Sequence, residues 1–420
     1  MALHDNPPLP LHVALVGAGV GGLATAVSLR RNGHHVRIFE TSQIKTEIGA
    51  GVGLQRNALR ILKQFGYSRD NLKPVDFDGA LAFDAKTGAG VMLPWLIPRD
   101  DELESRDLFC HRSDLHDELK RLAIGEGEGP PAQLFLDSKV VACDPEAGTL
   151  TLSSGEGIHA DVVIGADGVH STVRTSIVGN KVNAPGSGWS CFRCLFDASR
   201  LKEIPEFDWL TEGISGARSV AWREDGPLRI FFIYKCRSGT LVNFAASFTD
   251  PKQDDPDWTP AATREEILET FQGFHPKFLR ILDLPAENPP MKWQLRVTPL
   301  LPTWIRGRAA LLGDAAHATL PLLGQGLAMA IEEAATLGCL LPLGTTKEDV
   351  PARLEAYQTL RKARGEYVNT ESVAQAGVPE KRGTYLRSRE MQALLLEHDT
   401  VKIAQEYYNA HFGGGTARAA

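Results

Sequence analysis

The stretch that decides the fold is Val13-Ala14-Leu15-Val16-Gly17-Ala18-Gly19-Val20-Gly21-Gly22-Leu23-Ala24. Its four leading apolar residues predict a short buried strand, and the residues from 23 to 31 predict a helix. Between them, the spacing Gly17-x-Gly19-x-x-Gly22 is typical of a dinucleotide-binding turn. Gly17 permits the tight turn, Gly19 lets the backbone approach a pyrophosphate, and Gly22 lets helix and strand pack closely. The helix N-terminus would then direct unpaired N–H groups at the anion.

An acidic residue follows at the distance that this motif requires. A second strand is predicted at residues 35–39 and ends at Glu40, which lies 18 residues after Gly22. A carboxylate about 20 residues past the glycines grips a ribose hydroxyl in such sites. A glycine fingerprint alone is a weak signal, because glycine-rich turns also occur without a ligand. Strand, fingerprint, helix, strand and acid in this order predict a dinucleotide site.

Size and composition are those of an ordinary globular enzyme. The chain has 420 residues, enough for two domains and a large core, with 43% hydrophobic and 23% charged residues. A net charge of −7 argues against a nucleic-acid or anionic-membrane surface. No apolar run approaches the ~20 residues of a membrane span. The first ten residues lack the apolar segment of a secretory signal, so a cytoplasmic protein is expected.

The six cysteines are scattered, which suits a reducing compartment. Cys191 and Cys194 have the spacing of a redox or zinc pair, but no second pair or histidine lies near them. They fall in a strand-like run, where residues three apart face opposite sides. We therefore expect structural thiols and no metal site.

The pattern along the chain predicts two architectures. The first part alternates strands, helices and glycine turns, whereas residues 189–249 consist of strands separated by Pro, Gly and charged turns, typical of one antiparallel sheet. Residues 77–93 predict a hairpin. We expect a nucleotide-binding domain at residues 1–75, 96–180 and 293–365, a substrate domain at 76–95 and 181–292, and a C-terminal helical segment at 366–420.

Two more segments run from a buried strand into a glycine turn, Gly165-Ala-Asp-Gly-Val-His-Ser-Thr-Val-Arg174 and Gly313-Asp-Ala-Ala-His-Ala-Thr-Leu-Pro-Leu-Leu-Gly-Gln-Gly326. Together with the fingerprint they predict parallel strands whose C-terminal ends face one ligand. In this order and spacing, the three motifs resemble the group A FAD-dependent aromatic monooxygenases, the family of para-hydroxybenzoate and salicylate hydroxylases. The likeness covers about residues 11–375, and residues 324–335 are nearest to its fungal salicylate-hydroxylase-like branch.

The resemblance implies an α/β fold. A Rossmann-like FAD-binding domain of the glutathione-reductase type would carry an inserted antiparallel β-sheet substrate domain and C-terminal helices. FAD would be the cofactor, and NADH or NADPH the transient electron donor. No second full Rossmann unit is visible in the sequence, so the donor is expected to bind transiently on the same domain.

The resemblance also assigns cofactor roles to individual residues. Glu40 would bind the adenosine ribose, Gly53 would lie by the flavin, and Arg112 would reach the pyrophosphate region. Asp314 would bind the ribityl chain, and the backbone N–H of Leu327, just past Gly326, would lie near the flavin ring. Asp167 and Arg174 belong to a motif tied to both FAD and the nicotinamide donor.

Three of these motif residues have alternative roles. Arg112 could be an ordinary surface arginine at a helix start, and Asp167 could cap a turn. We interpret His317 as positioning backbone rather than as an acid–base group.

On the substrate side, the resemblance implies catalytic roles for Arg193 and Tyr234. Fungal members carry an Arg and a Tyr at similar places, where they orient a phenol and stabilise its phenolate. An arginine supplies a fixed cationic donor, and a tyrosine hydroxyl donates to or accepts from a phenol oxygen. The alternatives are an arginine paired with a surface acid and a tyrosine of the core. Residues 81–84 lack an arginine that some members carry, and residues 203–218 are expected to cover the pocket.

The implied activity is hydroxylation of a phenolic substrate with NAD(P)H and O2 through a C4a-hydroperoxyflavin. A carboxyl on the attacked carbon would make the reaction an oxidative decarboxylation. Dearomatising hydroxylation or epoxidation of a fungal natural-product intermediate is the alternative, because the same motifs serve both, and a flavin-bound protein without activity is a third possibility. The expected partners are a small phenol and O2, with no nucleic acid and no membrane span, in a monomer or homodimer.

Overall fold

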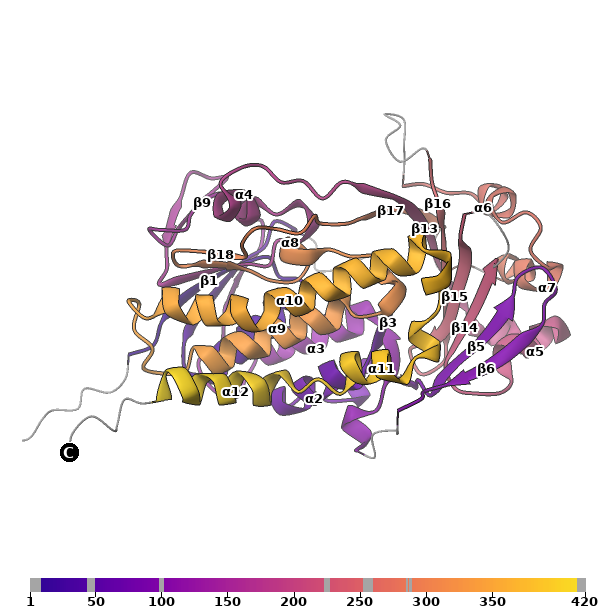
Figure 1. Ribbon diagram of the computed structural model, residues 1–420, viewed down its shortest axis with the longest axis horizontal. Coiled ribbons are helices and arrows are strands. Elements are labelled where there is room, and N and C mark those ends of the chain that lie inside the picture. Colours follow the sequence, from indigo (N-terminus) through magenta and orange to yellow (C-terminus); the bar gives the residue numbers. More distant parts are fainter. Residues whose placement is uncertain are drawn as a thin grey trace, which may run out of the picture.

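The computed structural model describes residues 9–43, 50–97, 102–222, 227–251, 260–284, 286 and 289–413. Two large sheets organise these residues, one on the left of Figure 1 and the other on the right. Long helices cover the first sheet, and short helices flank the second. The predicted α/β fold with a second, largely antiparallel sheet is confirmed.

The first sheet is built from the predicted parallel strands. In spatial order its strands are β18 (Ile305–Arg306), β19 (Ala309–Leu311), β12 (Val162–Gly165), β1 (His12–Val16), β2 (His35–Phe39) and β8 (Gln133–Phe135). All adjacent pairs are parallel except β18 with β19. β1, β12 and β19 are almost wholly apolar, as strands covered on both faces must be. These three strands are parallel neighbours, so their C-terminal ends lie on the same side of the sheet. The three glycine motifs follow these strand ends and therefore lie close together, as predicted.

Helices α1 (Val20–Arg31) and α9 (Gly326–Leu340) cover this sheet and contact each other. Both helices begin directly at a glycine motif. Helix α10 (Val350–Gly377) packs along α9 and crosses the centre of Figure 1. The chain then continues through α11 (Arg389–Leu396) and α12 (Thr400–His411).

The second sheet contains seven strands. In spatial order they are β17 (Met291–Arg296), β13 (Gly186–Asp197), β16 (Leu241–Thr249), β15 (Arg229–Cys236), β14 (Ala217–Trp222), β5 (Gly79–Asp84) and β6 (Gly90–Pro94). β5 and β6 form the predicted hairpin. The strands β13, β16, β15 and β14 pair antiparallel, as predicted. The hairpin joins them through β5, which pairs with β14 in parallel. The long segment between these two strands provides the crossover that a parallel pair requires.

The two faces of the second sheet have different compositions. Phe192, Phe231 and Phe244 point to one side, where they are buried beneath α6 (Arg264–Thr270) and α7 (Pro276–Leu279). Their neighbours in sequence point to the opposite side, because side chains alternate along a strand. We call that side the inner face and define it by six residues, Arg193, Ser219, Ala221, Ile230, Tyr234 and Asn243.

Residues 203–218, expected to cover the pocket, have side chains on both sides of the sheet, and Ala217 clusters with Tyr234 on the inner side. That this segment covers the pocket stays a prediction. Phe207 and Leu210 are buried in the apolar core on the opposite side of the sheet. The buried guanidinium of Arg218 holds this segment by donating to the carbonyl oxygens of Trp209 and Glu212. Phe207 and Leu210 fix this part of the segment, because burial of their side chains in the helix-covered core is favourable.

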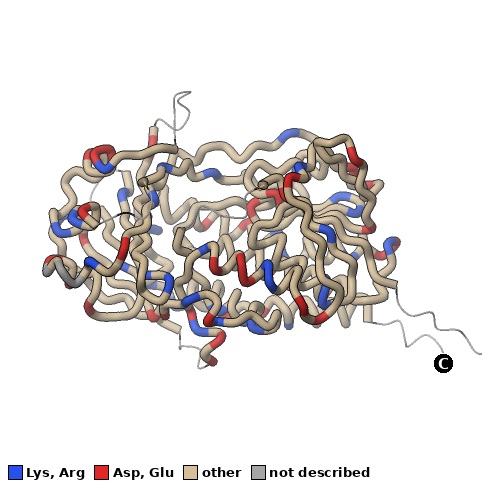
Figure 2. Tube along the Cα trace, turned by 180° about the vertical axis from the view of Figure 1, so that it is seen from behind, with Lys and Arg blue, Asp and Glu red and all other residues tan. Residues whose placement is uncertain are grey.

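Three expected domain boundaries fall inside regular elements, and the first of them, after residue 75, divides β4 (Val75–Asp76). The boundary after residue 292 lies within β17, which pairs with β13, and the boundary after residue 365 lies within α10. Because these elements are continuous across the expected boundaries, the division of the chain into domains remains a prediction. Within the described ranges, no helix has both the length and the apolar character needed to cross a membrane. Figure 2 shows acidic and basic residues mixed along the whole trace.

The alternation of the second sheet predicts unequal effects of truncation. Phe244 is fully buried against Phe196 and Phe231. Phe244→Ala should lower the free energy of unfolding by about 3–5 kcal/mol, because it leaves a cavity. Val91→Ala, on edge strand β6 where Val91 is 63% exposed, should lower it by less than about 1 kcal/mol. Urea unfolding measures both values, and equal losses would contradict the assignment of the core to the helix-covered side.

Candidate functional site

The turn between β1 and α1 leaves no space for side chains at two of its three fingerprint positions. A Cβ on Gly17 would lie 2.4 Å from the carbonyl oxygen of Ala166, and one on Gly22 would lie 2.1 Å from that of Gly17. Gly17 also has a φ of 101°, which favours glycine. A Cβ on Gly19 would meet no atom within 4 Å. Open space therefore adjoins the start of α1, where no side chain caps the helix, and this arrangement fits a diphosphate.

Glu40 lies beside that space at the end of β2. One of its carboxylate oxygens accepts a hydrogen bond from the N–H of Ala18 at 2.8 Å, and the other accepts one from the N–H of Ser42 at 2.8 Å. The carboxylate is half-buried and held in one position. Its place next to Ala18 fits the predicted contact with a ribose, which stays a prediction.

Asp167 uses its carboxylate within its own turn. It accepts hydrogen bonds from the Ser171 hydroxyl at 2.5 Å and from the N–H groups of Thr172 and Val173 at 2.7 and 3.1 Å. It thereby stabilises the start of α4 (Thr172–Val178), which is the turn-capping alternative. Burial raises the pKa of Asp167. A direct contact of this carboxylate with a cofactor stays a prediction.

Arg174 joins two of the three glycine motifs. Its buried guanidinium donates to the carbonyl oxygens of Val169 at 2.7 Å, Val182 at 2.9 Å and Ala315 at 3.0 Å. Val169 belongs to the second motif and Ala315 to the third. Arg174 therefore positions the two turns relative to each other.

Glu333 of α9 contacts two residues of the third motif. The Glu333 carboxylate lies 2.6 Å from Nε2 of His317 and accepts the N–H of Gly313 at 2.7 Å. Burial would lower the pKa of His317, but the Glu333 carboxylate outweighs burial and raises that pKa. His317 is 3% exposed, so its side chain positions the turn. Asp314, at the start of α8 (Asp314–His317), is exposed and free of this pairing, as a ribityl contact requires.

Gln325, between two glycines, points into the protein. Its side chain is 1% exposed, bonds to the amide of Gln55, and accepts from the amide of Asn57 at 3.0 Å. The helix that follows, α9, begins at Gly326 without a capping side chain, and a Cβ on Gly326 would meet no atom within 4 Å. The first N–H groups of α9, including that of Leu327, therefore border open space, which suits an electron-rich ligand atom.

Glu332 extends this buried network. Its carboxylate accepts from the Asn57 amide at 2.7 Å, from Arg361 at 2.7 Å and from Arg364 at 2.8 Å. Burial would raise the pKa of Glu332, but the two arginines outweigh burial and lower the pKa to about 2. Sequence reasoning missed both Glu332 and Glu333. Two adjacent acids in an otherwise apolar helix were the available signal.

The inner face meets the first domain at β3 (Gly51–Leu54). The N–H of Gly51 donates to the Asn243 side chain at 2.8 Å, and a Cβ on Gly51 would lie 2.6 Å from the Tyr234 ring. A Cβ on Gly53 would lie 3.2 Å from the Phe109 ring. These distances join protein atoms only, so the contact between Gly53 and a flavin stays a prediction.

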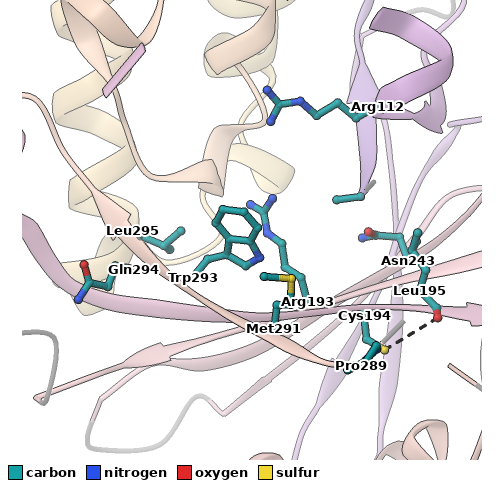
Figure 3. A pocket seen from close by; sticks show the side chains of 11 residues that line it. Arg112, Arg193, Cys194, Leu195, Asn243, Pro289, Met291, Trp293, Gln294 and Leu295 are labelled. Carbon is teal, nitrogen blue, oxygen red and sulfur yellow. Dashed lines mark hydrogen bonds between the residues drawn. The ribbon is translucent and has the colours of Figure 1, made fainter. Parts of the chain in front are cut away.

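A cavity of about 180 Å³ opens between this contact and the edge of the second sheet. Arg112, at the start of α3 (Arg112–Ile124), and Arg193, on β13, both line it. Figure 3 shows the Arg193 side chain beside the Trp293 ring, with the Arg112 side chain reaching toward the same space. No carboxylate occurs among the described residues that line the cavity, and Nε of Arg193 is buried without a hydrogen-bond partner there. The buried, unpartnered Nε of Arg193 suits an anionic ligand atom.

Tyr234 lies on the inner face but does not line this cavity. It is 6% exposed, and its ring stacks on that of Phe109 with a centroid distance of 3.9 Å. Burial raises the pKa of Tyr234, while the charge of Arg193 acts in the opposite direction. The hydroxyl therefore stays protonated at neutral pH. Tyr234 and Asn243 are directly paired, and Asn243 faces Leu195, two residues from Arg193.

Comparisons with known proteins agree with this geometry. The FAD binding domain family matches residues 142–372, and the NAD(P)-binding Rossmann-like domain family matches residues 15–44. The chain is 41% identical to hispidin-3-hydroxylase of Neonothopanus nambi over 97% of each chain. It is 30% identical to 3-hydroxybenzoate 6-hydroxylase of Polaromonas naphthalenivorans over 86% of each chain. A solved substrate complex of salicylate hydroxylase has a TM-score of 0.74 and 25% identity, covering 95% of this chain and 98% of that chain.

The pair of His317 and Glu333 predicts a pH-dependent stability. Because folding raises the pKa of His317 above its ordinary value of 6.5, the stabilisation is fully present below that pH. It is lost as the pH rises through the folded-state pKa. His317→Gln should lower the free energy of unfolding most at acidic pH, by about 3 kcal/mol, and progressively less at alkaline pH.

Urea unfolding at a series of pH values measures this difference. The matched control is His170→Gln, since His170 is exposed in the 3-10 turn Gly168–His170. The control should match the unsubstituted protein at every pH. A loss for His317→Gln that is constant with pH would contradict the charged pair.

Proposed function

The chain belongs to the FAD-dependent aromatic monooxygenases, the family of para-hydroxybenzoate and salicylate hydroxylases, and we propose that its inner face binds the phenol that this enzyme hydroxylates. One observation carries the assignment of the site: Nε of Arg193 is buried without a partner, in a cavity that a second arginine also lines. A phenolate oxygen would satisfy such a donor.

The residues at the three glycine motifs fit FAD. When bound and reduced by NAD(P)H, FAD activates O2 and delivers one oxygen atom to the ring. Open space adjoins Gly19 and Gly326, where a Cβ would meet no protein atom. A cofactor that occupied this space would explain why both positions are glycine, and this supports the fit. We propose that FAD is held by Gly17, Gly19, Gly22, Glu40, Gly53, Arg112, Asp167, Asp314, Gly326 and Leu327.

Arg193 and Tyr234 would prepare the substrate. A phenol ring attacks an electrophilic oxygen more readily as the phenolate, because the ring is then more electron-rich. Arg193 lines the cavity, and its charge would stabilise the phenolate oxygen. Tyr234 pairs with Asn243, which also lines the cavity, and we propose that its protonated hydroxyl donates a hydrogen bond to the same oxygen. Both interactions lower the pKa of the bound phenol.

The first candidate substrate is hispidin, named for the relative at 41% identity. We propose hydroxylation without loss of a carboxyl group as the main reaction. We further propose a cytoplasmic enzyme that acts as a monomer or homodimer. The six cysteines form no disulfide in the described part of the chain, which supports a reducing compartment.

FAD binding should depend on the open space at Gly19. In Gly19→Ala, the added methyl group meets no protein atom, so the stability of the apoprotein should change by less than about 1 kcal/mol. The affinity for FAD should fall about tenfold or more, because the methyl group occupies space next to the diphosphate. Quenching of flavin fluorescence on titration measures this affinity.

The matched control for this prediction is Gly157→Ala, on β11 (Gly157–His159), because a Cβ on Gly157 would likewise meet no atom within 4 Å. Its affinity for FAD should be unchanged. An unchanged affinity in Gly19→Ala would contradict the proposed diphosphate position.

The proposed reaction is tested with the FAD-loaded enzyme, NADH or NADPH, and hispidin. The product should be heavier than hispidin by one oxygen atom. Tyr234→Phe should lower kcat by about 10²-fold, because it removes the donor to the phenolate, and should leave FAD affinity unchanged. Tyr407→Phe on α12 is the control and should keep full activity.

Undiminished kcat in Tyr234→Phe would remove Tyr234 from the mechanism. Consumption of NAD(P)H without any hydroxylated product, with hispidin and with 3-hydroxybenzoate, would instead favour the dearomatising alternative. A product that has lost its aromatic absorbance would have the same meaning.

A further inference from the structure

A second cavity, of about 370 Å³, opens at the other end of the inner face. Ala221 and Ile230, which are paired neighbours on β14 and β15, form part of its wall. Leu322, from the 3-10 turn Pro321–Leu323, lines it from the opposite side. This turn directly precedes Gly324, the first residue of the glycine turn that starts α9. The cavity therefore lies between the inner face and the turn that precedes the segment assigned to the flavin, and the chain between Gln375 and Arg387 also borders it.

The lining of this cavity combines an apolar slot with a cationic rim. Leu228, Ile230 and Leu322 supply the apolar surface, and Arg382 and Arg387 supply the charge. No carboxylate occurs among its described lining residues. An apolar slot of this kind takes a flat aromatic or conjugated group, and an arginine at its end pairs with an anionic oxygen.

Arg387 is positioned to meet a ligand at this rim. It is exposed, and one of its guanidinium nitrogens donates to the carbonyl oxygen of Arg382 at 2.7 Å, which restrains the side chain. The glycine at 383 allows the close approach, since a Cβ there would lie 3.2 Å from the Arg387 guanidinium. A guanidinium has five N–H donors, so this single bond leaves donors for a ligand.

The spacing of residues along β15 gives the minimum length of a ligand that contacts both ends of the inner face. Ile230 and Tyr234 are four residues apart on the same face, which corresponds to about 13 Å along a strand. Phe232 lies between them, and its paired neighbours Ser219 and Ala245 are small. A molecule with one aromatic ring is shorter than this span.

We propose that the second cavity binds the far end of an elongated substrate, a second ring or conjugated arm that ends in a carboxylate, phenolate or enolate oxygen, and that Arg387 selects for this oxygen. The inference rests on the proposed function, because it takes the Tyr234 end of the inner face as the place of reaction. It adds a substrate class and a specificity-determining residue to that function.

The test compares two elongated phenols that differ at the far end, 4-hydroxystilbene-4′-carboxylate and 4-hydroxystilbene. The FAD-loaded enzyme should bind the carboxylate at least about tenfold more tightly, as a charge-assisted bond to arginine provides. Arg387→Ala should abolish this preference, and Arg387→Lys should restore part of it. Isothermal titration calorimetry measures the affinities. Arg389→Ala, on the neighbouring helix α11 and outside the cavity lining, should keep the full preference.

A second variant tests the slot itself. Ala221→Phe should weaken binding of both stilbenes by about tenfold or more, because its ring fills the apolar slot. The affinity for FAD serves as the folding control and should be unchanged. The inference is overturned if the unsubstituted enzyme shows no preference for the carboxylate or binds neither stilbene. It is also overturned if Arg387→Ala weakens both stilbenes equally, or if Ala221→Phe still binds both.

The two proposals fail in distinguishable ways. Failure of the proposed function appears as the absence of hydroxylated product from every phenol, whatever the affinities. Failure of this inference appears as hydroxylation by an enzyme whose binding ignores the far-end carboxylate.

Discussion

Two buried carboxylates on α9 hold the turns that surround the site. Burial of an unpaired carboxylate costs several kcal/mol, so each must be paired in the folded chain. Glu333 pairs with His317 and with the N–H of Gly313, and Glu332 pairs with Arg361 and Arg364. These partners come from separate segments of the chain. Satisfying the two charges therefore aligns the third motif, α9 and α10 with one another, and leaves the backbone N–H groups at the start of α9 for a ligand.

The second sheet contributes to the site through its inner face, whose residues line two cavities. Its stability comes from the helix-covered side, where Phe192, Phe231 and Phe244 are fully buried. The inner face carries polar residues such as Arg193 and Asn243 beside the apolar Ile230 and Phe232, and it contacts the first domain near Tyr234, which stacks on Phe109. Because the core lies on the opposite side, cavities can exist on the inner face without loss of the packing that holds the sheet together.

Individual residues show how far prediction of the site could reach. Gly17 and Gly22 lack space for a side chain, whereas Gly19 borders open space, as the motif predicts. The carboxylate of Asp167 caps a helix, which the motif alone could not distinguish from a ligand contact. Gln325 was predicted only as part of a glycine turn, yet its amide is buried in a polar network. A motif specifies spacing, but hydrogen-bond partners distant in sequence decide where its side chains point.

The sequence by itself determined the elements and their local geometry. The glycine spacings, the apolar strands and the alternation of the second sheet follow from short-range sterics and from side-chain periodicity, which act within a few residues. Only the tertiary structure decided which residues meet. It places Arg112 and Arg193 around one cavity, and it buries Phe207 and Leu210 on the helix-covered side of the sheet. The physical reason is that burial of apolar surface and pairing of buried charge depend on the whole packed chain, so no local pattern encodes them.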